Sequence, residues 1–95
     1  MPYLLRYHPR VAEEDVPEIP ASLRARIERS IDGRLTSDPT RYGAPLRGTL
    51  KGYRKLRVGD YRVVFKVSGH EVWILTILHR RDVHDAVVAR FAWTP

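Results

Sequence analysis

The sequence predicts an α+β fold in which helices pack on one face of an antiparallel β-sheet. Gly59-Asp60 separates two segments of alternating apolar and polar residues, which is typical of a β-hairpin closed by a type II′ turn. Residues 71–78 are apolar on both faces, which indicates a central strand. Residues 21–35 carry apolar side chains at every fourth position, as an amphipathic helix does. Because this apolar stripe needs a partner, we expect the helix to cover the apolar face of the sheet.

The length and composition predict one globular domain over residues 1–95. The chain is 43% hydrophobic and 29% charged, which is ordinary for a globular protein. It has no cysteine, which excludes disulfide bonds and thiolate metal sites. No apolar run reaches the length of a membrane span, and the first residues are too polar for a signal peptide. We therefore expect a cytoplasmic protein with no membrane partner.

The N-terminal part of the chain predicts one strand followed by one or two helices. Residues 1–8 form an apolar and aromatic run that is typical of a strand and stops at Pro9. Residues 9–18 carry acidic side chains early, so they form either a short helix that ends before Pro17 or a loop. The helix over 21–35 is expected to bury one stripe of residues. They are Leu23, Ile27, Ile31 and Leu35.

The Gly59-Asp60 turn determines which residues lie opposite each other in the hairpin. With a two-residue loop, Arg57 faces Arg62, and period-two alternation separates two faces. The apolar face consists of Leu56, Val58, Tyr61, Val63, Phe65 and Val67. The other face consists of Tyr53, Lys55, Arg57, Arg62, Val64 and Lys66. Like charges directly opposite each other destabilise a sheet, so we infer that the second face binds an anion.

The C-terminal part of the chain is expected to return to this turn. Because the strand over 71–78 runs antiparallel to its predecessor, its end, with His79, lies level with Arg62. Asp82 is expected to cap a short last helix over residues 83–91.

The net charge of +6 is unevenly distributed along the chain. Residues 1–45 hold seven Lys and Arg against seven Asp and Glu, whereas residues 46–95 hold ten against four. The excess therefore lies in the hairpin half, as expected if one surface binds nucleic acid.

Six side chains from three segments are expected to converge near one end of the sheet. They are Lys55, Arg57, Arg62, Arg80, Arg81 and His84. Such a cluster fits a phosphodiester backbone, because arginine offers paired donors and lysine a point charge. The cluster contains no pair of carboxylates and no nucleophile triad. The histidines show no metal-ligand spacing, so no metal or other cofactor is expected.

This cluster could cut RNA without a metal. The substrate's own 2′-hydroxyl would attack the phosphate, which requires a base, cations for the phosphorane and an acid for the leaving 5′-oxygen. Lys55 is the candidate base, because nearby cations favour the neutral form of a lysine. His84 is the one side chain of the cluster whose type titrates near neutral pH.

Two stretches, LRGTLKGYRKLRVGDYRVVFKV and ILHRRDVH, resemble the RelE-like branch of the RelE/ParE superfamily of type II toxin–antitoxin toxins. The resemblance implies two N-terminal helices packed on an antiparallel sheet, with a short C-terminal helix. It also implies an endoribonuclease that cleaves mRNA on the ribosome, inhibits translation and is neutralised by a cognate antitoxin.

By this resemblance Arg62 stabilises the phosphate, Lys55 is the base and Arg81 assists the leaving group. Because two arginines follow each other, Arg80 is an alternative to Arg81 for the leaving-group role, and Arg54 is an alternative to Lys55 for the role of the base. His84 stands where many relatives have tyrosine. The remaining basic side chains of this surface are expected to bind RNA. They are Arg54, Arg57, Lys66 and Arg80.

Two other functions fit the same residues. A ParE-like toxin shares the fold but inhibits DNA gyrase. The other hypothesis is that the chain is a non-enzymatic RNA-binding module.

Overall fold

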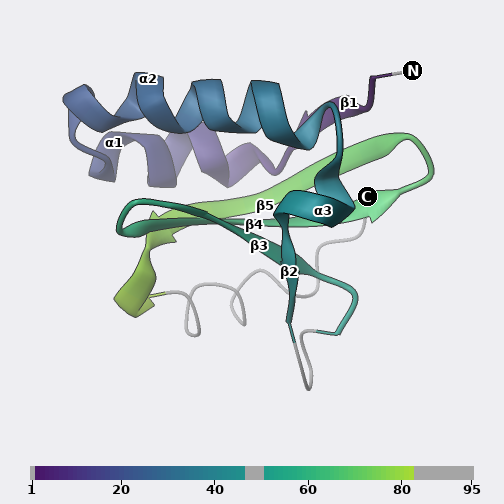
Figure 1. Cartoon of the computed structure of the whole chain (residues 1–95). Helices are drawn as coiled ribbons and strands as arrows, with labels where there is room; N and C mark the ends of the chain where they lie inside the picture. The colour runs from purple at the N-terminus through teal and green to yellow at the C-terminus, as the bar shows by residue number, and fades with distance from the viewer. Residues whose placement is uncertain (1, 47–50, 83–95) are drawn as a thin grey trace.

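The computed structural model of the chain describes residues 2–46 and 51–82. In this part a five-stranded sheet has one face covered by helices (Figure 1). Its order is β1-β5-β4-β3-β2. The strands are β1 (Leu4–Tyr7), β2 (Ala44–Pro45), β3 (Arg54–Val58), β4 (Tyr61–Ser68) and β5 (Glu71–His79). The predicted α+β fold is confirmed.

Two helical segments lie on the sheet. The first combines a π-helical turn, η1 (Val11–Asp15), with α1 (Val16–Glu18), and the second combines α2 (Ala21–Ser30) with the π-helical η2 (Ile31–Leu35). The helix predicted over 21–35 is therefore confirmed. Residues 9–18, for which the sequence allowed either a short helix ending before Pro17 or a loop, form a helix that continues through Pro17 to Glu18.

Short elements complete the described chain. Helix α3 (Pro39–Tyr42) leads into β2, and a 3₁₀ turn, η4 (Arg80–Asp82), follows β5. The last helix predicted over 83–91 lies outside the described residues. No helix between residues 2–46 or 51–82 is long and apolar enough to cross a bilayer.

Strand β1 departs from an all-antiparallel sheet. It pairs in parallel with β5, from Leu4 opposite Glu71 to Tyr7 opposite Ile74, while the pairs among β2 to β5 are antiparallel. A parallel neighbour needs a crossover connection. Here the helices carry the chain from β1 across the face of the sheet to β2 on the opposite edge (Figure 1).

The main core lies between the helices and the sheet. Ile27, Ile31 and Leu35 of the predicted stripe are buried, and Leu23 packs against them at the margin. The sheet contributes the predicted apolar face of the hairpin. Its fully or nearly fully buried members are Leu56, Val58, Val63 and Phe65.

The opposite face of the sheet is less polar than the sequence predicted. Val64 is fully buried and Tyr53 is 7% exposed, so neither belongs to an open charged surface. They form a second apolar cluster with Leu75 and Leu78. Leu75 enters this cluster at a bulge, where the register with β4 shifts between Val64 and the next residue. The charged residues of this face therefore lie mainly towards the Gly59-Asp60 turn, with Lys66 further along β4.

Asp15 closes the edge of β5 that β1 leaves uncovered. Its Oδ2 accepts hydrogen bonds from the Thr76 hydroxyl at 2.9 Å and from the Ile77 N–H at 3.0 Å. Since β1 ends opposite Ile74, the carboxylate takes the place of the next strand. This contact attaches the first helical segment to the strand that leads to Arg80 and Arg81.

Two glycines give opposite predictions for substitution by alanine. A Cβ on Gly43 would lie 2.2 Å from Cζ of the fully buried Phe65, whereas a Cβ on Gly33 would have no atom within 4 Å. Gly43→Ala should therefore lower the free energy of unfolding by about 1–3 kcal/mol through overpacking. Gly33→Ala should raise it by up to ~1 kcal/mol, because alanine is the better helix former. Urea denaturation of the two variants measures both effects. A Gly43→Ala protein as stable as Gly33→Ala would contradict the packing of Phe65 beneath α3.

Candidate functional site

The hairpin turn has the geometry that the sequence predicted. Gly59 has φ of 59°, and no residue other than glycine has positive φ in the described chain, as a type II′ turn requires. Arg57 lies opposite Arg62, and Val58 lies opposite Tyr61. The predicted register of the hairpin is therefore confirmed.

Arg62 is held by the turn itself. Its Nη1 donates to the Gly59 carbonyl at 3.0 Å and to the Tyr61 carbonyl at 2.9 Å. These bonds engage only one terminal nitrogen, so Nε and Nη2 remain available for a bidentate contact with an anion. Within residues 2–46 and 51–82, none of the ion pairs involves Arg62. Backbone carbonyl groups thus position the guanidinium, and no carboxylate in the described chain forms an ion pair with it.

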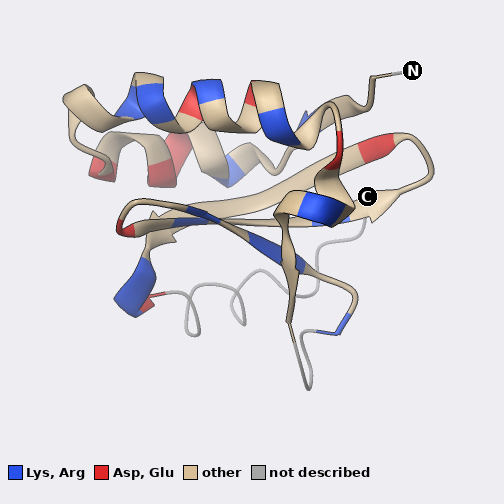
Figure 2. Cartoon of the chain, viewed as in Figure 1, with Lys and Arg blue, Asp and Glu red and all other residues tan. Residues whose placement is uncertain are grey.

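Lys55 and Arg57 extend the positive charge along β3 (Figure 2). Both side chains are exposed, and neither takes part in an ion pair within the described chain. Two positions separate them on the strand, so they share a face with Arg62, which lies directly across from Arg57. The structure therefore brings these three predicted site residues together.

The end of β5 returns to the turn, as expected. His79 pairs with Tyr61, and the Arg80 N–H donates to the Asp60 carbonyl at 2.8 Å. The Arg80 side chain lies beside the same residue, with Nε 3.9 Å from Asp60 Oδ1.

Arg81 has different surroundings from Arg80. It lines a cavity of about 300 Å³ together with carboxylates of the first helical segment and of η4. These carboxylates belong to Glu14, Asp15, Glu18 and Asp82. Of the two arginines, Arg80 lies nearer the turn that holds Arg62, while Arg81 faces an acidic wall. Arg80 and Arg81, between which the sequence could not decide, therefore lie in two different environments.

Two further predicted RNA contacts lie away from this group. Arg54 directs its Nη1 to the carbonyl oxygens of Gly43 at 2.8 Å and Thr40 at 3.3 Å, which favours a structural role in tying β3 to the end of α3. Lys66 places its Nζ 5.9 Å from the centre of the Tyr53 ring, in a cation–π contact. Burial raises the pKa of the Tyr53 hydroxyl, so this ring stays neutral beside the lysine.

His84 lies outside the described residues. His8 serves a local role, because its Nδ1 accepts the Arg10 N–H at 3.1 Å. In the part of the chain that the structure describes, no three His, Asp or Glu side chains come close enough together to hold a metal ion.

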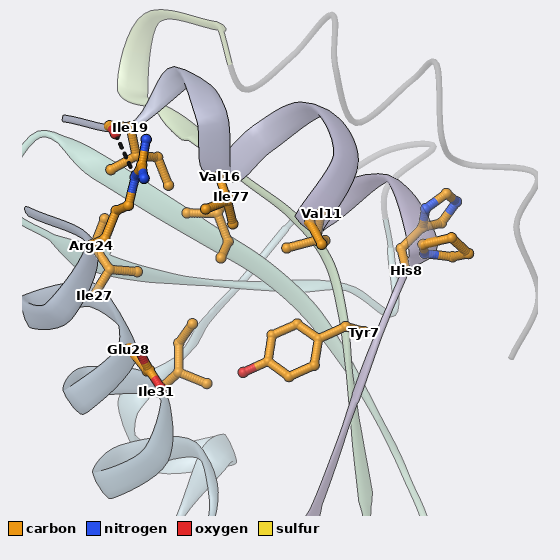
Figure 3. A pocket seen from close by; sticks show the side chains of 12 residues that line it. Tyr7, His8, Val11, Val16, Ile19, Arg24, Ile27, Glu28, Ile31 and Ile77 are labelled. Carbon is orange, nitrogen blue, oxygen red and sulfur yellow. Dashed lines mark hydrogen bonds between the residues drawn. The ribbon is translucent and has the colours of Figure 1, made fainter. Parts of the chain in front are cut away.

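A larger cavity of about 450 Å³ lies apart from the cationic group, between the helices and the end of β1 (Figure 3). Most of its lining is apolar, including Val11, Ile27 and Ile31. Tyr7 lies at its edge, and burial together with the negative charges of Asp32 and Glu28 raises the pKa of this hydroxyl. Its one arginine, Arg24, donates to the Ile19 carbonyl at 2.9 Å, so the lining offers mainly packing surface and does not gather several cations as the hairpin end does.

Comparisons with known proteins agree with this geometry. Residues 4–84 match the family model described as the ParE toxin of the type II toxin–antitoxin system parDE. The chain belongs to the RelE/ParE superfamily of type II toxins. The described hairpin and strand β5 of this RelE-family toxin lie inside the matched region.

Curated relatives place this toxin beside proteins named RelE and RelG. It is 33% identical to toxin RelG of Mycobacterium tuberculosis over 86 residues, which cover 88% of this chain and 98% of that protein. It is 37% identical to toxin RelE of the same organism over 71 residues, covering 73% of each.

Solved structures show the same architecture. The toxin–antitoxin complex RelBE2 of M. tuberculosis contains a chain with a TM-score of 0.77 and 30% identity, covering 84% of this toxin and all 100% of that chain. A mutant of E. coli toxin RelE in the free state matches with a TM-score of 0.72 over 96% of each chain. At 16% identity the latter shows the fold alone.

Sequence reasoning missed one residue beside the site. Arg26 of α2 lies next to the hairpin turn, and its Nη1 would be 3.4 Å from a Cβ placed on Gly59. The only signal in the sequence is that Arg26 lies between the stripe residues Leu23 and Ile27, at the margin of the buried face. That position does not reveal which strand end the helix meets.

Proposed function

We propose that this toxin is an endoribonuclease that cleaves mRNA by attack of the substrate's own 2′-hydroxyl. The observation that carries the proposal is the cross-strand pair of Arg57 and Arg62, with Lys55 on the same face and no carboxylate paired to any of them in the described chain. Such a pair opposes sheet formation unless an anion lies between or above the two charges. A phosphodiester is the anion whose geometry suits paired guanidinium donors.

The chemistry needs a base, charge stabilisation and an acid. Removal of the 2′-proton lets the 2′-oxygen attack phosphorus, the bond to the 5′-oxygen breaks, and the products are a 2′,3′-cyclic phosphate and a free 5′-hydroxyl. In this proposal Lys55 accepts the proton, while Nε and Nη2 of Arg62 stabilise the extra negative charge on the phosphorane. No step in this scheme calls for a metal ion.

The leaving 5′-oxygen requires a proton donor at the end of β5. The resemblance assigns assistance to Arg81, whereas the contact between Arg80 and Asp60 favours Arg80 as the residue nearer the phosphate. A guanidinium hardly ever releases its proton, so an arginine here acts through charge and hydrogen bonding. We propose His84 as the acid, because imidazole gives up a proton near neutral pH.

The partners in this proposal are mRNA on the ribosome and a cognate antitoxin, in the cytoplasm. The relative RelBE2 of M. tuberculosis was solved as a toxin–antitoxin complex, which supports an antitoxin for this toxin as well. The excess of positive charge at the hairpin suits both an RNA strand and an acidic segment of a protein.

Inhibition of DNA gyrase is the second candidate function, because the matching family model carries the name of the ParE toxin. A gyrase inhibitor has no need for Lys55 and Arg62 to share one face. A supercoiling assay with purified gyrase separates the two functions: the ribonuclease leaves supercoiling unchanged and cuts RNA.

Replacement of Arg62 tests the proposed cleavage. Arg62→Lys keeps a positive charge but loses the paired donors, and Arg62→Ala loses both, so cleavage should fall by roughly 10²–10³ in Arg62→Ala and less in Arg62→Lys. The measurement is single-turnover cleavage of ribosome-bound mRNA in EDTA, with analysis of product ends. A substrate with a 2′-deoxy residue at the cleaved position should remain intact.

Arg29→Ala is the matched control, because Arg29 is an exposed arginine of α2 that lines none of the three cavities. It should cleave at the wild-type rate. Cyclic phosphate ends that are absent from the products, or an Arg62→Ala protein that cleaves as fast as Arg29→Ala, would contradict the mechanism.

The two arginines after β5 can be separated by single substitutions. Arg80→Gln should reduce cleavage more than Arg81→Gln if proximity to the Arg62 turn decides the role, because Arg81 faces Glu14 and Glu18. The expected difference is about tenfold or more, the effect of one hydrogen bond to a charged group. The reverse order would assign the role to Arg81 and require its side chain to leave the acidic wall when RNA binds.

A further inference from the structure

A second cavity adjoins the hairpin turn on its helix side. Its volume is about 290 Å³, and its apolar part is formed by Leu23 and Ile27 of α2 with Val58 of β3. The cavity opens beside the turn that holds Arg62, since Gly59 forms part of its wall. Most of its lining residues lie on the helix side of the hairpin, and Arg57, which shares a strand face with Lys55, also lines it.

Two arginines on the wall give this cavity a positive charge. Arg26 comes from α2 and Arg57 from β3. Within the described chain neither makes a hydrogen bond or an ion pair, and no acidic residue lies three or four positions from Arg26 along the helix. The one carboxylate on the wall is that of Asp60, which has Arg80 Nε at 3.9 Å. Both wall arginines are therefore available to an anion.

Two aromatic rings complete the wall. Tyr61 and His79 are cross-strand partners whose ring centres are 5.6 Å apart, in an edge-to-face arrangement with an interplanar angle of 76°. An aromatic surface next to guanidinium groups is the combination that binds single-stranded RNA, because bases stack on the rings while phosphates contact the cations. Tyr61 also packs against the main core, so the fold itself holds this ring beside the arginines.

Arg57 connects this cavity to the proposed cleavage site. It lines the cavity and also lies directly opposite Arg62. Positive charge therefore continues from Arg62 over the end of the hairpin to Arg57 and Arg26. Arg57 is therefore the residue that an RNA strand bound at Arg62 would contact on entering the cavity.

We propose that the cavity between Arg26, Arg57 and the Tyr61–His79 ring pair is a second RNA subsite, which binds the phosphate and base of a nucleotide flanking the cleaved one. The inference rests on the proposed ribonuclease function, since it concerns the same RNA strand. It adds a binding determinant on helix α2, outside the groups that carry out the cleavage.

The test uses RNA binding, so that it does not depend on cleavage. The probe is a single-stranded 2′-O-methyl RNA, which cannot be cut, followed by fluorescence anisotropy over about 50 to 200 mM salt. Arg26→Gln should weaken binding roughly tenfold, as loss of one charged hydrogen bond does, and reduce the salt slope by about 0.7 per phosphate contact. Arg29→Gln removes the same charge from the same helix and should leave both quantities nearly unchanged. Equal affinities and salt slopes for the two variants would overturn the subsite.

A second measurement on the unmodified chain reports on the rings. On addition of the same RNA, the ring protons of Tyr61 and His79 should shift in the NMR spectrum through the ring current of a stacked base. Rings that do not respond at saturating RNA would overturn the proposal even if Arg26→Gln fails to fold. If the toxin binds this RNA as predicted but cleaves no RNA, the subsite holds and the proposed ribonuclease function fails. If the toxin cleaves RNA and Arg26→Gln binds the probe as well as the wild type does, the ribonuclease function holds and the subsite fails.

Discussion

The type II′ turn at Gly59 determines the register on which the candidate site depends. With φ of 59°, this residue adopts a backbone conformation that other residues rarely reach, and the turn sets Arg57 opposite Arg62. The same turn supplies the Gly59 and Tyr61 carbonyl oxygens that hold Arg62. A slip of one strand by one residue would turn the arginine of that strand towards the core. The turn at Gly59 therefore places Arg57 and Arg62 opposite each other, keeps both off the apolar face and positions the Arg62 guanidinium.

The rest of the fold supports this end of the sheet. Ile27 and Ile31 pack the long helix onto the sheet, which brings Arg26, at the margin of the buried face of α2, close to the turn. Asp15 fixes the exposed edge of β5, and β5 in turn carries His79 and Arg80 to the level of Tyr61 and Asp60. The second apolar cluster, around Val64 and its neighbours, occupies the middle of this face, and Arg57 and Arg62 lie beside the turn. The cationic group lies at this end because much of the remainder of both faces is used for packing.

Much of this arrangement follows from local sequence patterns. The hairpin register needs only the turn residues and period-two alternation, and the helix over 21–35 needs only its stripe, so both could be predicted. The burial of Val64 could not, because it depends on a bulge that places Leu75 beside it. The contact of Arg26 with the turn could not be predicted either. The helix also carries Arg24 and Arg29, and only the way in which α2 packs on the sheet decides which arginine meets the hairpin turn.

We infer that Arg57 and Arg62 face each other to bind phosphate, at a cost to the stability of the free protein. The most direct measurement is the free energy of unfolding of Arg57→Gln and of the wild type at low salt, alongside binding of an uncleavable RNA. Removal of one like charge should raise this free energy by a few tenths to about 1 kcal/mol, and the gain should shrink as salt screens the pair. RNA affinity should fall in the same variant. A variant that is less stable at every salt concentration and binds RNA as well as the wild type would contradict the account, because Arg57 would then be a structural residue.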